Sequence, residues 1–225
     1  MTETSLHAVD SLLFDLDGTL VDTITLILYS FRETFRILGL PPRSDRELLL
    51  QIGRPLLEQA RDIDPGRAGD IFDLYQRVYD DNYQHLVRDY PGVREAIAGL
   101  KRRGYRLAVV TSKRRSNAAR DLEMFGLASY CEVLVAAEDT ENHKPDPDPV
   151  LKALEELRIS RREATFIGDS PYDVRSAHAA GLPAGVVGWG PFPEEVLREE
   201  SPDYWIPEPQ GLLRLFPGRG TRTRS

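Results

Sequence analysis

A short apolar run that stops at two aspartates constrains this chain more than any other feature. Residues 12–14 have the continuous apolar character of a buried strand, and Asp15 and Asp17 follow directly, with Gly18 next to them. Strand periodicity directs both aspartates to the same side of the chain. Two carboxylates this close repel each other unless a cation lies between them or one carries a proton. The sequence therefore predicts a chemical site here, with a plain Asp-Gly turn as the alternative.

The second half of the chain predicts an α/β fold. From Pro91 onward, helical segments alternate with short apolar runs. Strands are expected at 106–110, 133–135, 164–167 and 184–187. Strands separated by single helices form parallel sheets with right-handed crossovers. Because the runs are apolar throughout, we expect a Rossmann-like parallel sheet with helices on both faces.

The stretch from residue 23 to residue 89 predicts an all-helical insertion instead. Apolar residues recur every three or four positions across 23–38, and Gly39 ends that helix. Ser44 can cap a second helix, which extends to Ile52, and a long helix is expected at about 67–87. No strand signal appears in this stretch. The expected domains are a core of residues 1–22 and 90–225 and a helical cap of residues 23–89.

Composition excludes several classes of function. The net charge of -7 argues against a nucleic-acid-binding surface, because phosphate backbones select basic faces. Cys131 is the single cysteine, which excludes an intrachain disulfide and fits a reducing compartment. The sequence has no signal-peptide pattern and no apolar run of membrane-spanning length. We expect a cytoplasmic monomer or homodimer without nucleic-acid or membrane partners.

Polar residues follow the other expected strands, at the end of a parallel sheet where ligands bind. These residues are Thr111, Ser112 and Lys113 after 106–110, Lys144 after 133–135, and Asp169 and Asp173 after 164–167. Hydroxyl and backbone N–H groups ahead of a helix suit phosphoryl oxygens, and a lysine adds a point charge. Each residue alone has a plain alternative as a helix cap or a solvated loop residue. Those alternatives do not explain the joint placement at strand ends.

The order of these residues resembles the four motifs of the haloacid dehalogenase (HAD) superfamily of phosphohydrolases. Asp15-Leu16-Asp17-Gly18-Thr19 resembles the first motif, Thr111 the second, Lys144 the third, and Gly168-Asp169 with Asp173 the fourth. A helical insertion after the first motif resembles the cap of the branch that contains phosphoglycolate phosphatases, bacterial pyrophosphatases and β-phosphoglucomutase. The segment 137–149 is particularly similar to the phosphatase and pyrophosphatase members.

This resemblance implies a Mg2+-dependent phosphatase that acts on a small phosphorylated metabolite. Asp15 would be the nucleophile that forms an aspartyl-phosphate, and Asp17 would serve as acid and then as base. The implied metal ligands are the Asp15 carboxylate, the Asp17 backbone carbonyl and Asp169, with Asp173 supporting the metal site from behind these ligands or through Lys144. The other expected contacts are Thr111 and Lys144 in catalysis, and Thr19, Ser112, Lys113 and Arg54 in substrate binding.

Several alternatives remain open at this point. Asp17 disfavours a dehalogenase, because family members that displace halide lack an acid there. Phosphoglycolate is the first expected substrate and inorganic pyrophosphate the second, followed by a β-phosphoglucomutase-like phosphotransferase and a non-catalytic phospho-ligand binder. Arg54 lies where related proteins place a specificity loop and is a candidate for a substrate carboxylate or second phosphate, with an exposed helix-start arginine as the alternative. Hinges are expected near 22–23 and 89–91.

Overall fold

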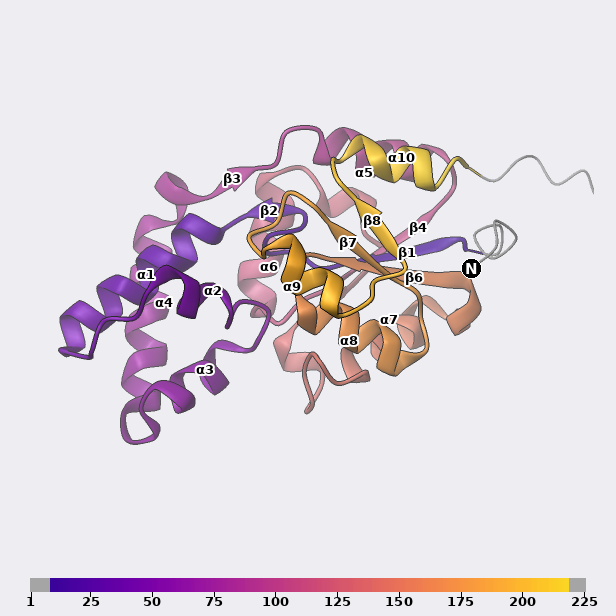
Figure 1. The fold of residues 1–225 in the computed structure, drawn as a ribbon. Coiled ribbons are helices and arrows are strands. Elements are labelled where there is room, and N and C mark those ends of the chain that lie inside the picture. Colours follow the sequence, from indigo (N-terminus) through magenta and orange to yellow (C-terminus); the bar gives the residue numbers. More distant parts are fainter. Residues whose placement is uncertain (1–8, 219–225) are drawn as a thin grey trace, which may run out of the picture.

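The computed structural model describes residues 9–218, which form a parallel sheet between layers of helices and a separate group of inserted helices (Figure 1). Positions 1–8 and 219–225 of the expected core lie outside the described residues. The strands of the sheet, in spatial order, are β5 (Val133–Val135), β4 (Arg106–Val110), β1 (Ser11–Phe14), β6 (Ala164–Gly168), β7 (Ala184–Val187) and β8 (Tyr204–Ile206). All neighbouring pairs are parallel, so the predicted α/β fold with a parallel sheet is confirmed.

The first strand lies in the middle of the sheet because its residues are apolar on both sides. Leu12 and Leu13 are fully buried, and Leu13 is in register with Ala108 of β4 and Phe166 of β6. A central strand has helices over both faces and cannot alternate with polar residues. The predicted site residues that follow β1 are therefore placed between two neighbouring strand ends.

Helices cover both faces of the sheet. The helices that follow the inserted segment are α5 (Val93–Arg102), α6 (Arg115–Met124), α7 (Asp148–Leu157), α8 (Pro171–Ala180), α9 (Glu194–Glu199) and α10 (Gln210–Leu215). In Figure 1, α5 and α10 pack together above the sheet, and α7 and α8 lie below it. Short 3-10 helices occur at Pro65–Arg67, Ala128–Tyr130, Ala137–Asp139 and Arg161–Glu163. Among residues 9–218, no helix is both long and apolar enough to span a membrane.

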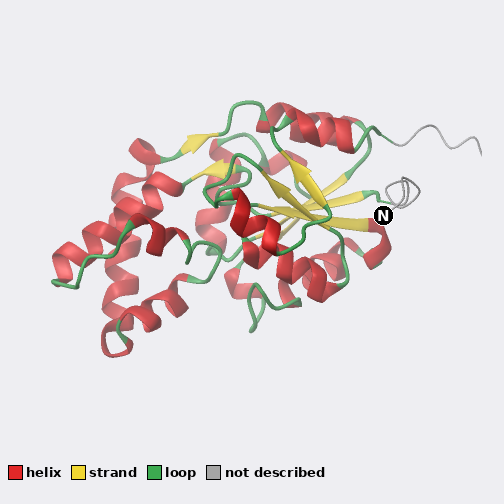
Figure 2. Ribbon diagram, viewed as in Figure 1, coloured by secondary structure: helices red, strands yellow, loops and turns green. Residues whose placement is uncertain are grey.

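The inserted segment is helical, as its periodicity predicts (Figure 2). Its helices are α1 (Ile24–Leu38), α2 (Asp45–Leu49), α3 (Leu56–Ile63) and α4 (Ala68–Leu86). Gly39 ends α1 with a left-handed φ of 62°, and Ser44 caps α2. The ring centroids of Phe31 and Tyr75 lie 4.6 Å apart where α1 packs against α4. Ile52, expected in the second helix, lies beyond its end because α2 stops at Leu49.

Three other expectations need correction. Arg88–Asp89 forms a short strand, β3, that pairs antiparallel with β2 (Val21–Asp22), although the insertion was expected to contain no strand. Two exposed charged residues give no strand pattern, and their pairing depends on β2 lying alongside. The strand β8 was not predicted either, because three residues at a sheet edge are too short for a periodic signal. Finally, α8 begins at Pro171 rather than at Val174, since proline is favoured in a first helical turn.

Candidate active site

The carboxyl ends of the three central strands bring the expected site residues together. β1 ends directly before Asp15, β4 ends directly before Thr111, and β6 ends directly before Asp169. Because β1 pairs in parallel with both β4 and β6, these three ends lie at one edge of the sheet. In parallel sheets this edge is where ligands bind.

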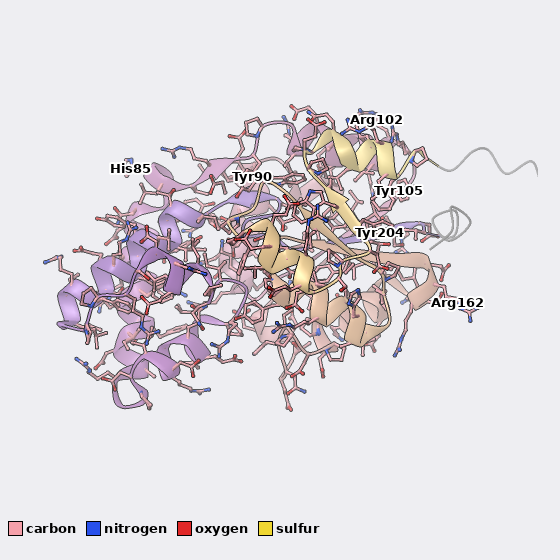
Figure 3. The ribbon with its side chains drawn as sticks, in the orientation of Figure 1. His85, Tyr90, Arg102, Tyr105, Arg162 and Tyr204 are labelled. Atoms are coloured by element: carbon pink, nitrogen blue, oxygen red, sulfur yellow. The ribbon has the colours of Figure 1, made fainter. Side chains whose placement is uncertain are left out.

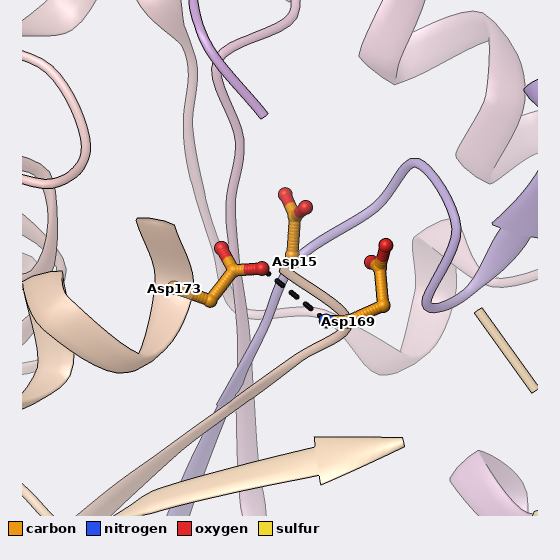
Figure 4. Close-up of side chains that lie close together, drawn as sticks. All are labelled: Asp15, Asp169 and Asp173. Carbon is orange, nitrogen blue, oxygen red and sulfur yellow. Dashed lines mark hydrogen bonds between the residues drawn. The ribbon is translucent and has the colours of Figure 1, made fainter. Parts of the chain in front are cut away.

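A cluster of buried carboxylates lies at this edge (Figure 4). Asp15, Asp169 and Asp173 each offer an oxygen atom, and these atoms lie within 4.8 Å of one another. All three side chains are buried. Three carboxylates cannot remain ionised this close together without positive charge among them.

Lys144 supplies part of that charge. Its Nζ lies 2.9 Å from Asp15 Oδ1 and donates a hydrogen bond to Asp173 Oδ1 at 2.7 Å. The lysine is only 2% exposed and precedes a cis peptide bond to Pro145. A solvated loop lysine, the plain alternative for this residue, is therefore not what the structure contains.

Asp173 is fully engaged by its own surroundings. One oxygen accepts from Lys144, and the other accepts from the backbone N–H of Asp169 and from the N–H and hydroxyl of Ser170. Figure 4 draws the contact with the Asp169 N–H as a dashed line. A carboxylate with this many donors has little capacity left for a cation. Its place fits support through Lys144 better than direct metal coordination.

Asp169 is held differently and keeps one oxygen unpaired. Thr19 donates a hydrogen bond from Oγ1 to Asp169 Oδ1 at 2.5 Å. Asp169 Oδ2 is buried and accepts no hydrogen bond from any residue between 9 and 218. Thr19 does not line the cavity described below, although it was expected to bind substrate. The structure places it behind Asp169 instead.

The loop after β7 also contributes to this site, and the sequence reasoning missed it. Trp189 donates from its indole Nε1 to the backbone oxygen of Thr19 at 3.0 Å. A Cβ atom on Gly190 would overlap the Asp169 side chain and lie 3.2 Å from Gly18 O. The signal that could have found this loop is its position directly after a strand of the parallel sheet, where the other site residues also lie.

Asp17 is bonded at a single oxygen by two donors. Lys113 Nζ and Thr23 Oγ1 each lie 2.5 Å from Asp17 Oδ1. The Lys113 side chain is 7% exposed, and although burial lowers its pKa, Asp17 and other neighbours raise it well above the usual value. Lys113 is thus bonded to a catalytic candidate, whereas a direct contact with substrate was expected.

A cavity of about 310 Å³ opens in front of Asp15 and Asp17, between the sheet edge and the inserted helices. Thr111, Ser112, Lys113 and Arg54 line it, together with apolar residues of the inserted helices. Arg54 donates to Gln51 and to Asp62, at 2.6 and 2.7 Å, so it is neither free nor fully exposed. Helix α6 begins after Arg114 without a side-chain cap, so Thr111 and Ser112 do not serve as its cap.

The inserted helices also contact the core around this cavity. Ser112 donates from Oγ to Gly53 O at 2.6 Å, and Tyr172 donates from its hydroxyl to Leu50 O at 2.9 Å. Tyr90, directly after β3, lies where the inserted helices meet the sheet (Figure 3). The inserted segment, residues 23–89, therefore covers one side of the cavity.

The raised pKa values of the carboxyl groups in this cluster indicate that a cation would suit the site. Burial raises the pKa of Asp15 to about 7, against the lowering influence of Lys144. Burial, Asp173 and Asp15 together raise the pKa of Asp169 well above its ordinary value. A divalent cation beside these two carboxylates would restore their charge, and the unpaired Asp169 Oδ2 offers a hard oxygen ligand. The residues present suit a metal such as Mg2+.

Comparison with known proteins gives the family. The family described as haloacid dehalogenase-like hydrolase matches residues 12–187, which include the ends of β1, β4 and β6 and also Lys144. The chain is a member of this family. The predicted membership of the haloacid dehalogenase superfamily is thereby confirmed.

Individual relatives of this hydrolase carry two kinds of name. "Putative pyrophosphatase PpaX" from Caldanaerobacter subterraneus is 42% identical over 93% of this chain and 96% of its own length. A protein of the same name from Clostridium perfringens is 36% identical over 92% of this chain and 97% of its own length. The crystal structure of a "putative phosphoglycolate phosphatase" from Lactobacillus plantarum has a TM-score of 0.83 and 27% identity, and covers 92% of this chain and 99% of that one.

Proposed function

We propose that this hydrolase is a Mg2+-dependent phosphatase that moves the phosphoryl group of a small metabolite first to Asp15 and then to water. The observation that carries the proposal is the pairing of Asp15 with Lys144 at 2.9 Å, at the place where Asp15 and Asp17 line the cavity. A buried carboxylate next to an ammonium group is suited to nucleophilic attack on phosphorus.

Asp15 and Asp169 would hold the metal, with the backbone carbonyl of Asp17 as a further ligand. When bound, Mg2+ supplies positive charge that offsets the repulsion between a phosphoryl group and these carboxylates. Asp173 would act through Lys144, because it accepts a hydrogen bond from the ammonium group of that lysine. Thr19 would keep the remaining oxygen of Asp169 turned toward the cation.

The chain's own residues would carry the reaction. Asp15 attacks the phosphorus atom, and the bond from phosphorus to the leaving oxygen breaks as Asp17 protonates that oxygen. Asp17 then takes a proton from the water that hydrolyses the aspartyl-phosphate. The Thr111 hydroxyl, the Ser112 N–H group and Lys144 would stabilise charge on the transferring oxygens.

The inserted helices would act as a cap, with residues 23–89 as the cap and the remainder as the core. Closing a cap excludes water from phosphoryl transfer. Hydrogen bonds from Ser112 to Gly53 and from Tyr172 to Leu50 support this role, because they already join the two parts. The antiparallel β2–β3 pair lies where the hinges are expected.

Phosphoglycolate is the first candidate substrate and inorganic pyrophosphate the second. The name of the Lactobacillus plantarum structure supports the first, and the names of the two relatives above support the second. Both compounds carry a second anionic group, for which Arg54 and Arg114 on the cavity wall are candidates.

The test is phosphate release from phosphoglycolate, pyrophosphate, sugar phosphates, nucleotides and p-nitrophenyl phosphate, with and without Mg2+. We expect release that requires Mg2+ and is lost in Asp15→Asn. The ranking of the substrates decides between the two candidates. No release from any compound by the folded, Mg2+-loaded protein would overturn the proposal.

A further inference from the structure

A further buried carboxylate, outside the cluster of Asp15, Asp169 and Asp173, lies behind the proposed acid and base. Asp121, on α6, is fully buried, and its Oδ2 lies 2.5 Å from Lys113 Nζ. The same ammonium group lies 2.5 Å from Asp17 Oδ1. Asp17 lines the cavity and Asp121 does not, so Lys113 lies between one carboxylate that can meet a substrate and one that cannot.

Tyr83 completes this arrangement from the inserted helices. Its hydroxyl, on α4, donates a hydrogen bond to Asp121 Oδ1, the oxygen that Lys113 does not use. The ring of Tyr79, one turn earlier on α4, has its centroid 5.3 Å from Lys113 Nζ. Three polar contacts in series, Tyr83 to Asp121, Asp121 to Lys113 and Lys113 to Asp17, therefore connect α4 to Asp17.

Stability alone does not account for a buried charge at this position. Removing a carboxylate from water is unfavourable, and proteins in which apolar residues replace a buried ion pair are often as stable or more so. Helix α6 already buries Ala118 and Leu122. An apolar residue at position 121 would extend the buried apolar face of α6. Asp121 instead bonds to the ammonium group of Lys113.

We propose that Asp121 and Tyr83 position Lys113 so that its ammonium group holds the Asp17 carboxylate in the orientation needed for proton transfer. Lys113 and Thr23 both bond to Asp17 Oδ1, which leaves Oδ2 for the leaving group and then for water. The proton on Asp17 passes to the leaving oxygen as its bond to phosphorus breaks, and Asp17 regains a proton from the attacking water. This inference rests on the proposed function, since it takes Asp17 as the acid and base.

Two aryl esters of similar size separate positioning of an acid from general damage. The 4-nitrophenolate ion leaves readily without a proton, whereas phenolate, with a conjugate-acid pKa of about 10, gains from protonation. In Asp121→Asn, we expect kcat/KM for phenyl phosphate to fall roughly 10- to 100-fold, and that for 4-nitrophenyl phosphate to fall less than about threefold. The ratio kcat/KM reports transfer to Asp15, so later hydrolysis of the aspartyl-phosphate does not enter the comparison.

Two further variants make the result decisive. Glu123→Gln removes an exposed carboxylate from the same helix and should leave both esters unaffected. Tyr83→Phe removes one hydroxyl group and should reproduce the selective loss more weakly, about three- to tenfold, which keeps the test valid if Asp121→Asn does not fold. Equal losses for the two esters in both variants, with Mg2+ and Asp15 still required, would overturn this inference alone. Activity that survives Asp15→Asn would overturn the proposed function and this inference together.

Discussion

Gly190 is a residue whose small size leaves room for the proposed metal ligand Asp169. A Cβ atom at this position would overlap Asp169, the carboxylate that keeps a free oxygen. We expect Gly190→Ala to weaken Mg2+ binding roughly tenfold, because displaced supporting groups commonly cost 10- to 100-fold in metal affinity. Isothermal titration calorimetry measures this directly, without any assay of activity.

Gly69→Ala is the matched control for that variant. Gly69 lies on α4 with no atom within 4 Å of the position of an added Cβ atom. Alanine favours a helix over glycine by up to about 1 kcal/mol, so this variant should be equally or more stable and should bind Mg2+ like the wild type. Equal Mg2+ affinity in both variants would show that Gly190 does not support Asp169.

Protons should compete with Mg2+ at Asp15. Burial raises the pKa of this carboxyl group to about 7, so it is mostly protonated below that pH and mostly ionised above it. A cation requires the ionised form, and Mg2+ affinity should therefore rise with pH, about tenfold from pH 6 to pH 8. Calorimetry at the two pH values, in buffers of different ionisation enthalpy, measures both the affinity and the released proton. An affinity that is the same at both would contradict the prediction.

At the level of single elements, two helix caps of the same kind allow a matched comparison. Ser170 caps α8 and bonds Asp173 Oδ2 at 2.6 Å, and Ser44 caps α2 and bonds Glu47 Oε2 at 2.6 Å. Replacing either serine by alanine should lower the free energy of unfolding by roughly 1 kcal/mol. Only Ser170→Ala should also reduce turnover, because Asp173 holds Lys144 in the active site.

Urea unfolding and a Mg2+-dependent phosphatase assay on both variants provide the two measurements. A loss of activity of several-fold is expected for Ser170→Ala and none for Ser44→Ala. If both variants lost activity in proportion to their stability, the cap of α8 would have only a structural role.

For the whole molecule, we expect the contacts between the inserted helices and the core to limit how readily the cavity opens. Tyr172→Phe removes the hydrogen bond to Leu50 O, which contributes about 1 kcal/mol. We expect amide hydrogen exchange in segment 50–53 to accelerate about fivefold, while Tyr29→Phe, on an exposed part of α1, should not change it. Exchange that is unchanged in Tyr172→Phe would mean that this contact does not hold the two parts together.

The same contacts bear on closure around a ligand. Mg2+ and a phosphate analogue should favour the closed arrangement, since both bind at the core surface that the inserted helices cover. Solution scattering should then show a smaller radius of gyration with both ligands than without them. Identical scattering, together with the same orientation of residues 23–89 in free and bound crystals, would argue against hinges near 22–23 and 89–91.

Five of the six strands in the described sheet, most of the helices and the order of the residues at the strand ends were predictable from the sequence alone. These features depend on local chemistry: apolar runs form the buried strands, Gly39 and Ser44 end and begin helices, and Asp15 directly follows β1. Such signals lie within a few residues of one another, so they can be recognised before the chain folds.

The side chains that support these residues became apparent only from the packing of the folded chain. Asp121 has the sequence pattern of an exposed helical acid, yet it is fully buried because Lys113 and Tyr83, the latter 38 residues away, satisfy its charge. Trp189 bonds the backbone of Thr19 across 170 residues. Contacts of this range depend on how strands and helices pack, and no local pattern encodes them. The candidate reacting groups were therefore predictable, whereas supporting residues such as Asp121, Tyr83 and Trp189 were not.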